Sequence, residues 1–397
     1  MDIQRIRQSF PVLRNTIWMH TSSCGPMLNS VRDEIVHYYT LTAEVGDNVP
    51  PNSEERMASY RDLRPALAAF IGATPEEIAY NYGIASGIST IACGLDWKEG
   101  DEVIITDKEY PTNVLPWIAL RERFGVRIKK IRLVEDKETI LRELRQAIGP
   151  RTRLLSFSHI DSSEGFLAPA QEMCQVARDH EVLTQIDGAQ AIGRLPVDVK
   201  ELGCDFYTVL PFKYLFGPRG IGALYIRRDR IPEVAISWTG SGAQARWQWG
   251  TEEATFHDTA QRYEFGTSRL SILYAAWRKS FEFFAEIDLE ETRARTLALA
   301  QILADELGKV PKVRVYAPRI PEFSAGQVNV AIEGVKNYQL LERMRKGWGI
   351  FPCRQWSNED WIRLPVALFN TQQDIGKVIE AVATVAADAS GPRPDVS

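Results

Sequence analysis

Short apolar segments alternate with amphipathic segments from about residue 60 to residue 235, and this alternation constrains the fold more than any other feature. Two amphipathic helical patterns are Ile140–Ile148 and Ala168–His180. Strands that alternate with helices of about 10–15 residues indicate an α/β fold with a mainly parallel, doubly wound sheet. Seven segments have the length and composition of buried strands: Glu77–Tyr82, Glu102–Thr106, Val126–Ile131, Leu154–His159, Val182–Ile186, Asp205–Val209 and Gly222–Ile226.

Several of these predicted strands end in polar residues. The segments DEVIIT, RLLSFSHI and EVLTQID are apolar and then finish in a polar side chain. The carboxyl ends of parallel strands meet at one edge of the sheet, and open α/β sheets bind their ligands at that edge. The sequence therefore predicts a ligand site there.

A second region with a different pattern begins near Leu270. Leu273–Leu307 has the pattern of a long helix that is interrupted near Ile287. The elements expected after it are strands at Val313–Tyr316 and Gln327–Ile332 and helices at Tyr338–Arg345 and Thr371–Ala387. We expect an N-terminal segment (1–20) that packs on the small domain, a large domain (21–270) and a small α+β C-terminal domain (271–397).

Composition and charge exclude several classes of partner. Charged residues make up 25% of the chain, their signs are mixed, and no basic stripe indicates nucleic-acid binding. No apolar run approaches the ~20 residues of a membrane span. The start, MDIQRIRQSFPVLRN, lacks the apolar core of a secretory signal, so we expect a cytoplasmic protein. The five cysteines are scattered, which argues against a metal site and against a disulfide framework.

The strongest chemical signal is the segment Asp187-Gly-Ala-Gln190 followed by Lys213 in FKYLFGPRGIG. Asp187 ends an apolar strand, so its carboxylate is predicted at the ligand edge. A buried anion beside a pyridine nitrogen keeps the ring protonated and electron-withdrawing, and Gln190 can donate to the phenolic oxygen of such a ring. A lysine in a tight, partly apolar pocket loses proton affinity, which suits imine formation.

Together these residues predict a pyridoxal 5'-phosphate (PLP) enzyme in which Lys213 holds the cofactor as a Schiff base. The alternative is that the first segment is an ordinary strand-to-turn connection and that Lys213 is a surface lysine. Either fragment alone is a weak signal. Their combination, in order and on the predicted edge of the sheet, favours PLP.

The chain also resembles the class V aminotransferase and cysteine desulfurase family, of PLP fold type I. The resemblance extends from FPVLRNTIWMHTSSCGP to IRLPVALFNTQQDI. It implies that Gly83, Ala85 and Ser86 form a phosphate-binding turn at a helix start, where backbone N–H groups bind anions. It implies further that Tyr110 stacks on the cofactor ring and that Ser162 lies near the ring oxygen and the substrate.

The same resemblance assigns residues to the substrate and to a second subunit. Gly266 and Thr267 match a turn that reaches the phosphate of the neighbouring subunit, which implies a homodimer with shared active sites. Arg363 matches the arginine that binds the α-carboxylate of an amino-acid substrate; the alternative is an arginine in a surface ion pair. Ser22 and Ser23 are the substrate-binding candidates near the start of the chain. Further pocket candidates, whose directions the sequence leaves open, are the rest of Thr21–Gly25 and Tyr214, Trp238, Arg354 and Trp356.

Two departures from the family pattern bear on the reaction. Relatives carry Ser-x-His before the lysine, where this chain has Leu210-Pro211-Phe212, so a phosphate donor and a polar neighbour are missing. Desulfurases carry a reactive cysteine on a loop before the carboxylate-binding arginine. In this chain that stretch, FPCRQWSNEDWIR, is shorter, and Cys353 matches a strand position better than the loop nucleophile.

We therefore expect β-elimination by a carbon–sulfur lyase that acts on an S-substituted cysteine. An aminotransferase is the main alternative, and an epimerase-like outcome also stays open. A persulfide-forming desulfurase is disfavoured by the missing loop cysteine. The remaining alternative is a non-catalytic or nucleotide-binding α/β protein. Against dinucleotide binding, no GxGxxG segment opens a helix after the first strand. Against a non-catalytic protein, the chain contains together Lys213, Asp187, Gln190 and Arg363.

Overall fold

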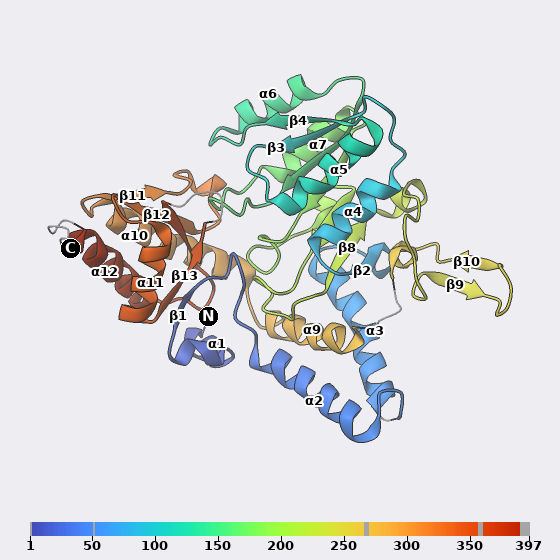
Figure 1. Ribbon diagram of the computed structural model, residues 1–397, viewed down its shortest axis with the longest axis horizontal. Helices are drawn as coiled ribbons and strands as arrows, with labels where there is room; N and C mark the ends of the chain where they lie inside the picture. Colours follow the sequence, from blue (N-terminus) through green and yellow to red (C-terminus); the bar gives the residue numbers. More distant parts are fainter. Residues whose placement is uncertain (1, 51, 266–269, 356–359, 390–397) are drawn as a thin grey trace, which may run out of the picture. The chain divides into compact units, whose positions relative to one another are not determined.

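A computed structural model describes residues 2–50, 52–265, 270–355 and 360–389. The chain divides into two compact units (Figure 1). The large unit comprises Met27–Asp161 and Ala168–Glu286, and the small unit comprises Met1–Pro26, Ser162–Leu167 and Ile287–Ser397.

The large unit is built on a sheet in which the described residues form seven strands. In spatial order these are β2 (Ile78–Asn81), β8 (Gly222–Ile226), β7 (Phe206–Val209), β6 (Leu183–Asp187), β5 (Thr152–Ser158), β3 (Glu102–Thr106) and β4 (Arg127–Ile131). Only β8 runs antiparallel to its neighbours β2 and β7. The prediction of a mainly parallel sheet is confirmed, because strands buried on both faces leave continuous apolar runs in the sequence.

Helices pack against this sheet and against one another. They are α2 (Asn29–Val45), α3 (Asn52–Phe70), α4 (Ile84–Gly94), α5 (Leu115–Phe124), α6 (Lys137–Ala147), α7 (Ala170–Asp179), α8 (Val199–Leu202) and α9 (Ser271–Phe284). A buried cluster that includes Ile88, Trp117 and Phe206 joins α4 and α5 to the strands. Short 3-10 turns occur at Pro75–Glu77, Pro111–Asn113, Arg228–Glu233 and Ala260–Tyr263.

The observed boundaries between the units differ from those predicted. Helix α9 packs on α2 and α3 and belongs to the large unit, so the boundary lies at Glu286/Ile287 and not at 270/271. The first 26 residues and Ser162–Leu167 belong to the small unit, although we expected residues after 20 and the whole of the latter segment in the large domain. Helical periodicity predicts that α9 exists but does not tell which partner its apolar face packs against.

The small unit holds a sheet of five strands in the described residues. In order they are β1 (Ile17–Met19), β13 (Ile350–Arg354), β14 (Trp361–Pro365), β12 (Gln327–Ile332) and β11 (Val313–Tyr316). The N-terminal strand β1 pairs in parallel with β13. The helices are α1 (Ile3–Gln8), α10 (Leu289–Gly308), α11 (Asn337–Trp348) and α12 (Gln372–Asp388), with 3-10 turns at Pro11–Arg14 and Pro321–Phe323. Leu303, Met344 and Val382 are among the side chains that fill the core.

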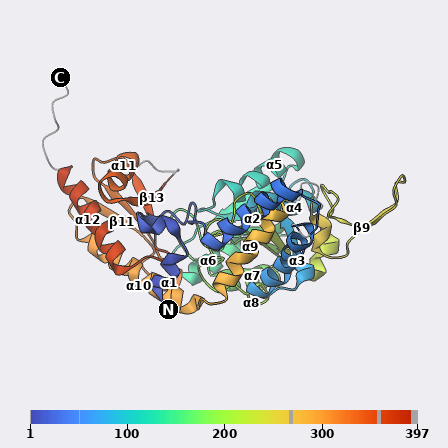
Figure 2. The same ribbon diagram turned by 90° about the horizontal axis from the view of Figure 1, so that it is seen from below.

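A two-stranded hairpin, β9 (Gln244–Trp247) and β10 (Ala254–Phe256), extends from the large unit (Figure 2). The sequence pattern did not predict it, because nearly all of its residues are exposed and neither strand has a buried face. Its exposed aromatic side chains include Trp247, Trp249 and Phe256.

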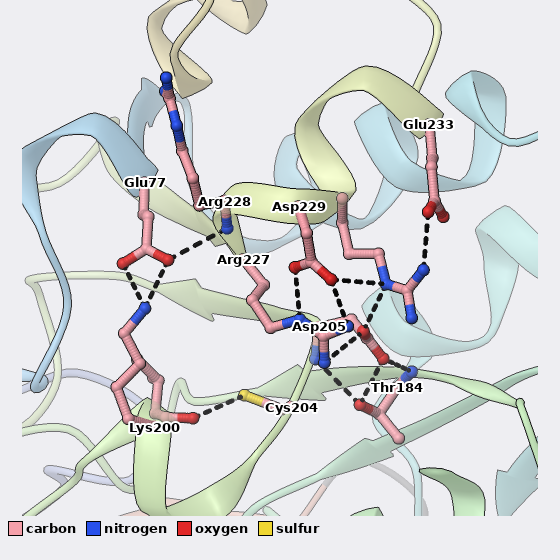
Figure 3. A network of polar contacts seen from close by, with 11 residues as sticks. Glu77, Thr184, Lys200, Cys204, Asp205, Arg227, Arg228, Asp229 and Glu233 are labelled. Atoms are coloured by element: carbon pink, nitrogen blue, oxygen red, sulfur yellow. Dashed lines mark hydrogen bonds and ion pairs between the residues drawn. The ribbon is translucent and has the colours of Figure 1, made fainter.

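A network of charges stabilises the sheet of the large unit at the starts of β6 and β7 (Figure 3). Asp205 is buried, and its carboxylate accepts hydrogen bonds from the Thr184 amide at 2.8 Å and the Thr184 hydroxyl at 3.0 Å. The guanidinium groups of Arg227 and Arg230 lie 2.9 and 3.0 Å from the same carboxylate. Asp205 thus connects the start of β6 with the segment that follows β8.

No helix in the described residues is long and apolar enough to cross a membrane.

Candidate cofactor and substrate sites

The carboxylate of Asp187 lies at the carboxyl end of β6, at the predicted edge of the sheet. It is 5% exposed and accepts a hydrogen bond from the Ala189 amide at 2.8 Å. Burial raises the pKa of Asp187, while that amide and the positive charge of Lys213 oppose the rise. The positive charge of Lys213 thus acts on Asp187, and the buried carboxylate suits the protonated nitrogen of a pyridine ring; the cofactor roles of both residues stay predictions.

Lys213 lies in a tight connection between β7 and β8. The Gly217 amide donates to the Pro211 carbonyl at 3.0 Å, and the Phe216 amide donates to the Lys213 carbonyl at 3.3 Å. A side chain at Gly193 would come within 2.5 Å of the Tyr214 carbonyl oxygen, so the two connections pack backbone to backbone. The chain around the lysine is thus held in one conformation.

The residues before Lys213 are apolar, and two of the three are buried. Leu210 and Pro211 are buried, and a side chain at Gly217 would meet the Pro211 ring at 2.7 Å. Arg194, from the turn after β6, lies with its guanidinium 4.6 Å above the Tyr214 ring. Packed residues thus flank Lys213 on both sides in the chain.

The predicted phosphate turn opens helix α4. Gly83 has a φ of +114°, a conformation that favours glycine. The Gly87 amide makes the first helical bond, to the Gly83 carbonyl, so the amides of Ile84, Ala85 and Ser86 precede the intrahelical ladder. Such amides, at the positive end of the helix dipole, suit a phosphate.

Two local contacts shape this turn. The Ser86 hydroxyl donates to the Gly83 carbonyl at 2.8 Å and accepts from the Tyr82 amide at 3.0 Å. A side chain at Gly222 on β8 would meet the Gly83 Cα at 2.5 Å, so β8 needs a glycine at this position. The residues of the large unit thus fit PLP at both ends, with an acceptor for the ring nitrogen and donors for the phosphate.

Tyr110 is 46% exposed and stands at the start of the 3-10 turn after β3. An exposed aromatic face near the ligand edge suits a stacking role. Gln190 is buried in the turn after Asp187. Both residues stay predicted cofactor contacts.

Sequence reasoning missed Glu109, which is the centre of a hydrogen-bond network beside Tyr110. Its carboxylate accepts from Thr106 Oγ1 at 2.5 Å, Asn113 Nδ2 at 2.7 Å and Ser158 Oγ at 2.6 Å, and from the Ser158 amide at 3.0 Å. Burial raises the pKa of Glu109 to about 7, although these donors oppose the rise. The network joins the ends of β3 and β5, and the polar residues that end these strands were the available signal.

His159, which follows β5, is a buried ring beside Tyr207. A ring nitrogen lies 3.1 Å from the Tyr207 hydroxyl, and burial lowers the pKa of His159 to about 4. The ring is therefore neutral at physiological pH and serves as a hydrogen-bond partner of Tyr207.

In the small unit, Arg363 on β14 is 4% exposed. Its Nη1 donates to the Ser162 carbonyl at 2.6 Å, and its Nη2 and Nε donate to the Arg354 carbonyl at 3.0 and 3.3 Å. It forms no ion pair with a carboxylate in the described residues, so the alternative of a surface ion pair is wrong. In the described residues the hydrogen-bond acceptors of this buried cation are carbonyls, and such an environment suits an incoming carboxylate.

Cys353 on β13 lies directly opposite Arg363 in the antiparallel pairing of β13 with β14. Its thiol is buried, and its Sγ lies 3.3 Å from the Ser22 hydroxyl. Burial raises the pKa of Cys353, but a hydrogen bond from His20 and the charge of Arg363 outweigh burial and lower it. The His20 Nδ1 lies 2.8 Å from the Pro352 carbonyl. Sequence reasoning missed His20, because nothing in the linear pattern connects it with residue 353.

The remaining predicted residues are placed as follows. The Ser23 amide donates to the His20 carbonyl at 3.0 Å. Ser162 contributes its carbonyl to Arg363 within the small unit, so its role near the cofactor ring stays a prediction. Gly266, Thr267 and Trp356 lie outside the described residues.

Residues 17–377 match the model of the family aminotransferase class-V. A cysteine desulfurase of Pectobacterium atrosepticum is 26% identical over 96% of this chain and 98% of its own length. A probable cysteine desulfurase of Mycolicibacterium paratuberculosis is 26% identical over 97% of this chain, which spans 58% of that relative's length. The solved structure of the cystine C–S lyase C-DES with cysteine persulfide has a TM-score of 0.87 and 24% identity, covering 94% of this chain and 99% of C-DES.

The structural likeness shows the fold of PLP fold type I enzymes. Another structure of C-DES contains its PLP cofactor. The family match covers the strands and turns that carry Asp187, Lys213 and Arg363. The chain therefore belongs to the class V aminotransferase family of PLP-dependent enzymes.

Proposed function

We propose that this enzyme is a carbon–sulfur lyase that breaks the Cβ–S bond of an S-substituted cysteine by β-elimination. The amino acid and one water yield the free thiol, pyruvate and ammonia. Family membership gives a PLP-dependent enzyme, and the proposal adds the bond that is broken and the class of substrate. The residues that support it lie in both units.

The position of Cys353 is the observation that carries the proposal. A desulfurase needs a thiolate on a mobile segment that can attack the substrate sulfur and leave carrying it. Cys353 is a buried residue inside a strand pair, and the sequence between β13 and β14, QWSNED, contains no cysteine. This arrangement favours a reaction in which the sulfur leaves with the rest of the substrate.

The residues of this chain have separate roles in the proposed reaction. PLP, when bound, draws electron density from the Cα of the amino acid. The Lys213 amine takes the Cα proton, because an amine in a tight, partly apolar pocket is a good base near neutral pH. Asp187 holds the proton on the pyridine nitrogen, the amides of Ile84–Ser86 bind the phosphate, and Arg363 binds the substrate carboxylate.

The comparisons support sulfur chemistry. Curated relatives over nearly the whole chain are named cysteine desulfurase, and C-DES is described as a cystine C–S lyase. The family name itself supports the main alternative, an aminotransferase. A transaminase would use the same Lys213, Asp187 and Arg363 and would differ in where the proton returns.

Product analysis of the PLP-loaded enzyme tests the proposal. A panel of cystine, S-alkylcysteines, alanine and aspartate is supplied with and without a 2-oxo acid acceptor. Pyruvate and ammonia, formed in equal amounts from the sulfur compounds without an acceptor, would support the lyase. A 2-oxo acid that keeps the substrate side chain, and that forms only with an acceptor, would replace it with an aminotransferase.

We also propose that the enzyme is a homodimer with shared active sites and that it is cytoplasmic. The exposed aromatic residues of the β9–β10 hairpin support a second copy as the partner, since Trp249 is 84% exposed. Light scattering should show a dimer whose affinity falls in a Trp247→Ser/Trp249→Ser variant. Ile302→Ser, on an exposed face of α10, is the matched control. A monomeric wild type would exclude the shared sites.

A further inference from the structure

The small unit contains a buried group of ionisable residues that the proposed reaction does not fully use. Cys353 and Arg363 are opposite each other on β13 and β14, and the Ser22 hydroxyl lies 3.3 Å from the Cys353 Sγ. The His20 Nδ1 lies 2.8 Å from the Pro352 carbonyl and acts as its donor there. This leaves Nε2 as the ring nitrogen for the hydrogen bond between His20 and Cys353.

The charges around the thiol come from two sides. His20 and Arg363 are the charged groups that act on Cys353 in the described residues. Strand β1 is the apolar Ile17–Met19, and Arg345 of the neighbouring helix α11 lies instead over the Phe351 ring at 5.6 Å. Since no carboxylate in the described residues pairs with Arg363, Cys353 is the one group near it that can carry a negative charge.

We propose that the Cys353 thiolate is the counter-ion of Arg363 when no substrate is bound, and that binding of a substrate carboxylate is coupled to uptake of one proton by Cys353. The proposal rests on the role of Arg363 in the proposed function. It makes Cys353, with His20, a group that sets the pH range in which the enzyme accepts carboxylates. The one bond formed to sulfur is S–H: the thiolate gains one proton from solvent and becomes a thiol, with no change of oxidation state.

The direction of the pH dependence follows from this exchange. Below the pKa of Cys353 the thiol is neutral, Arg363 is available, and carboxylate affinity is independent of pH. Above it the thiolate competes, so affinity falls about tenfold for each pH unit. The lowered pKa of Cys353 brings this fall below the ordinary range of a thiol. Burial lowers the pKa of His20, but its interactions with Cys353 and with the Pro352 carbonyl together outweigh burial and raise it, so that protonated His20 can donate to the thiolate through Nε2. Replacement of His20 removes this donor and moves the fall to higher pH.

The test uses the PLP-loaded enzyme and 3-(methylthio)propionate, a carboxylate without an amine, so that Lys213 takes no part in binding. Calorimetry gives the Kd from pH 6 to pH 10, and titrations in two buffers of different ionisation enthalpy count the protons. Variants are Cys353→Ala, His20→Asn and, as matched cysteine control, Cys93→Ala, whose thiol is exposed in the large unit.

We expect wild type and Cys93→Ala to take up one proton per ligand at alkaline pH and to lose affinity about tenfold per pH unit. Cys353→Ala should take up none and keep its affinity, and His20→Asn should lose affinity only at higher pH. A pH-dependent fall that persists in Cys353→Ala, or a wild-type affinity that does not change with pH, would overturn the coupling while leaving Arg363 as the carboxylate site.

An Arg363→Met variant separates this inference from the proposed function. If Arg363→Met binds the ligand as tightly as wild type, or if wild type does not bind it at any pH, the carboxylate site itself is wrong and both proposals fall. If Arg363→Met loses binding at every pH while Cys353→Ala behaves like wild type, only the coupling is wrong.

Discussion

The two units each bury one charged side chain at a predicted ligand position, and they stabilise it in different ways. Asp187 in the large unit is an anion with one backbone donor and the nearby positive charge of Lys213. Arg363 in the small unit is a cation that donates hydrogen bonds to two carbonyl oxygens, and Cys353 lies directly opposite it on the neighbouring strand. Both are costly to bury alone. Each buried charge therefore suits a ligand group of opposite sign: Asp187 suits a protonated ring nitrogen, and Arg363 suits a carboxylate.

The largest expected effect is at Lys213, whose positive charge acts on Asp187. Lys213→Ala should abolish turnover, because both the cofactor link and the proposed base are removed. Steady-state rates measure this loss, and Lys377→Ala, at an exposed position of α12, is the control. Borohydride reduction and peptide mapping of the wild type should find the cofactor on Lys213; a cofactor adduct on another lysine would reject the assignment.

Asp187→Asn tests the anion of the large unit. The amide keeps the size of the side chain but cannot hold a proton on the pyridine nitrogen, so we expect the rate to fall by about 10²-fold or more. Folding and PLP content should stay near wild type, as measured by thermal unfolding and by the absorbance of the bound cofactor. Near-normal rates would show that another group protonates the ring.

Arg363 tests the cation of the small unit. Arg363→Lys keeps the charge but loses the planar fork, and we expect KM to rise by about 10- to 100-fold, since charged hydrogen bonds contribute about 1.5–3 kcal/mol. The turnover number should change less than KM. The reverse split, with an unchanged KM and a reduced turnover number, would place Arg363 at the reacting atoms instead of the carboxylate.

Glu109 is a second buried carboxylate of the large unit. It differs from Asp187 in that four hydrogen-bond donors, rather than one amide and the charge of a lysine, oppose the rise of its pKa on burial. Its pKa in the folded protein, about 7, lies above the ordinary value of 4.5, so the folded state binds its proton more tightly than the unfolded state. Its contribution to stability is therefore greatest at low pH and is lost as pH rises from about 4.5 to about 7. Denaturant unfolding at pH 5 and pH 8 should show that Glu109→Gln removes part of this loss. An unchanged pH profile would assign the loss to other groups.

The smallest effect is expected at Cys353 at neutral pH. Cys353→Ser keeps a small hydrogen-bonding side chain opposite Arg363, so the turnover number should stay within about threefold of wild type, and any loss should be in KM. A persulfide label on the wild type after turnover is the companion measurement. Complete loss of activity together with a persulfide on Cys353 would replace the lyase by a desulfurase.

Much of the fold could be predicted because buried parallel strands and amphipathic helices leave distinct periods in the sequence. All seven strands of the large sheet were predicted within two residues at either end, and β11 and β12 were predicted with the observed bounds. The β9–β10 hairpin could not be predicted, because its short strands have no buried face. The sequence also could not show that α9 belongs to the large unit, because periodicity identifies the apolar face of a helix but not the elements against which that face packs.

Local patterns sufficed to predict the mainly parallel sheet, the edge at which Asp187 stands and Asp187 with Lys213 as candidate cofactor residues, since periodicity and polar strand ends extend over only a few neighbouring residues. Only the tertiary structure decided that Glu109 joins β3 to β5 and that His20 meets Cys353 opposite Arg363. His20 and Cys353 are more than 300 residues apart in the chain and come together because β1 pairs with β13. Long-range strand pairing of this kind depends on the energy of the whole packed core, and no local pattern records it.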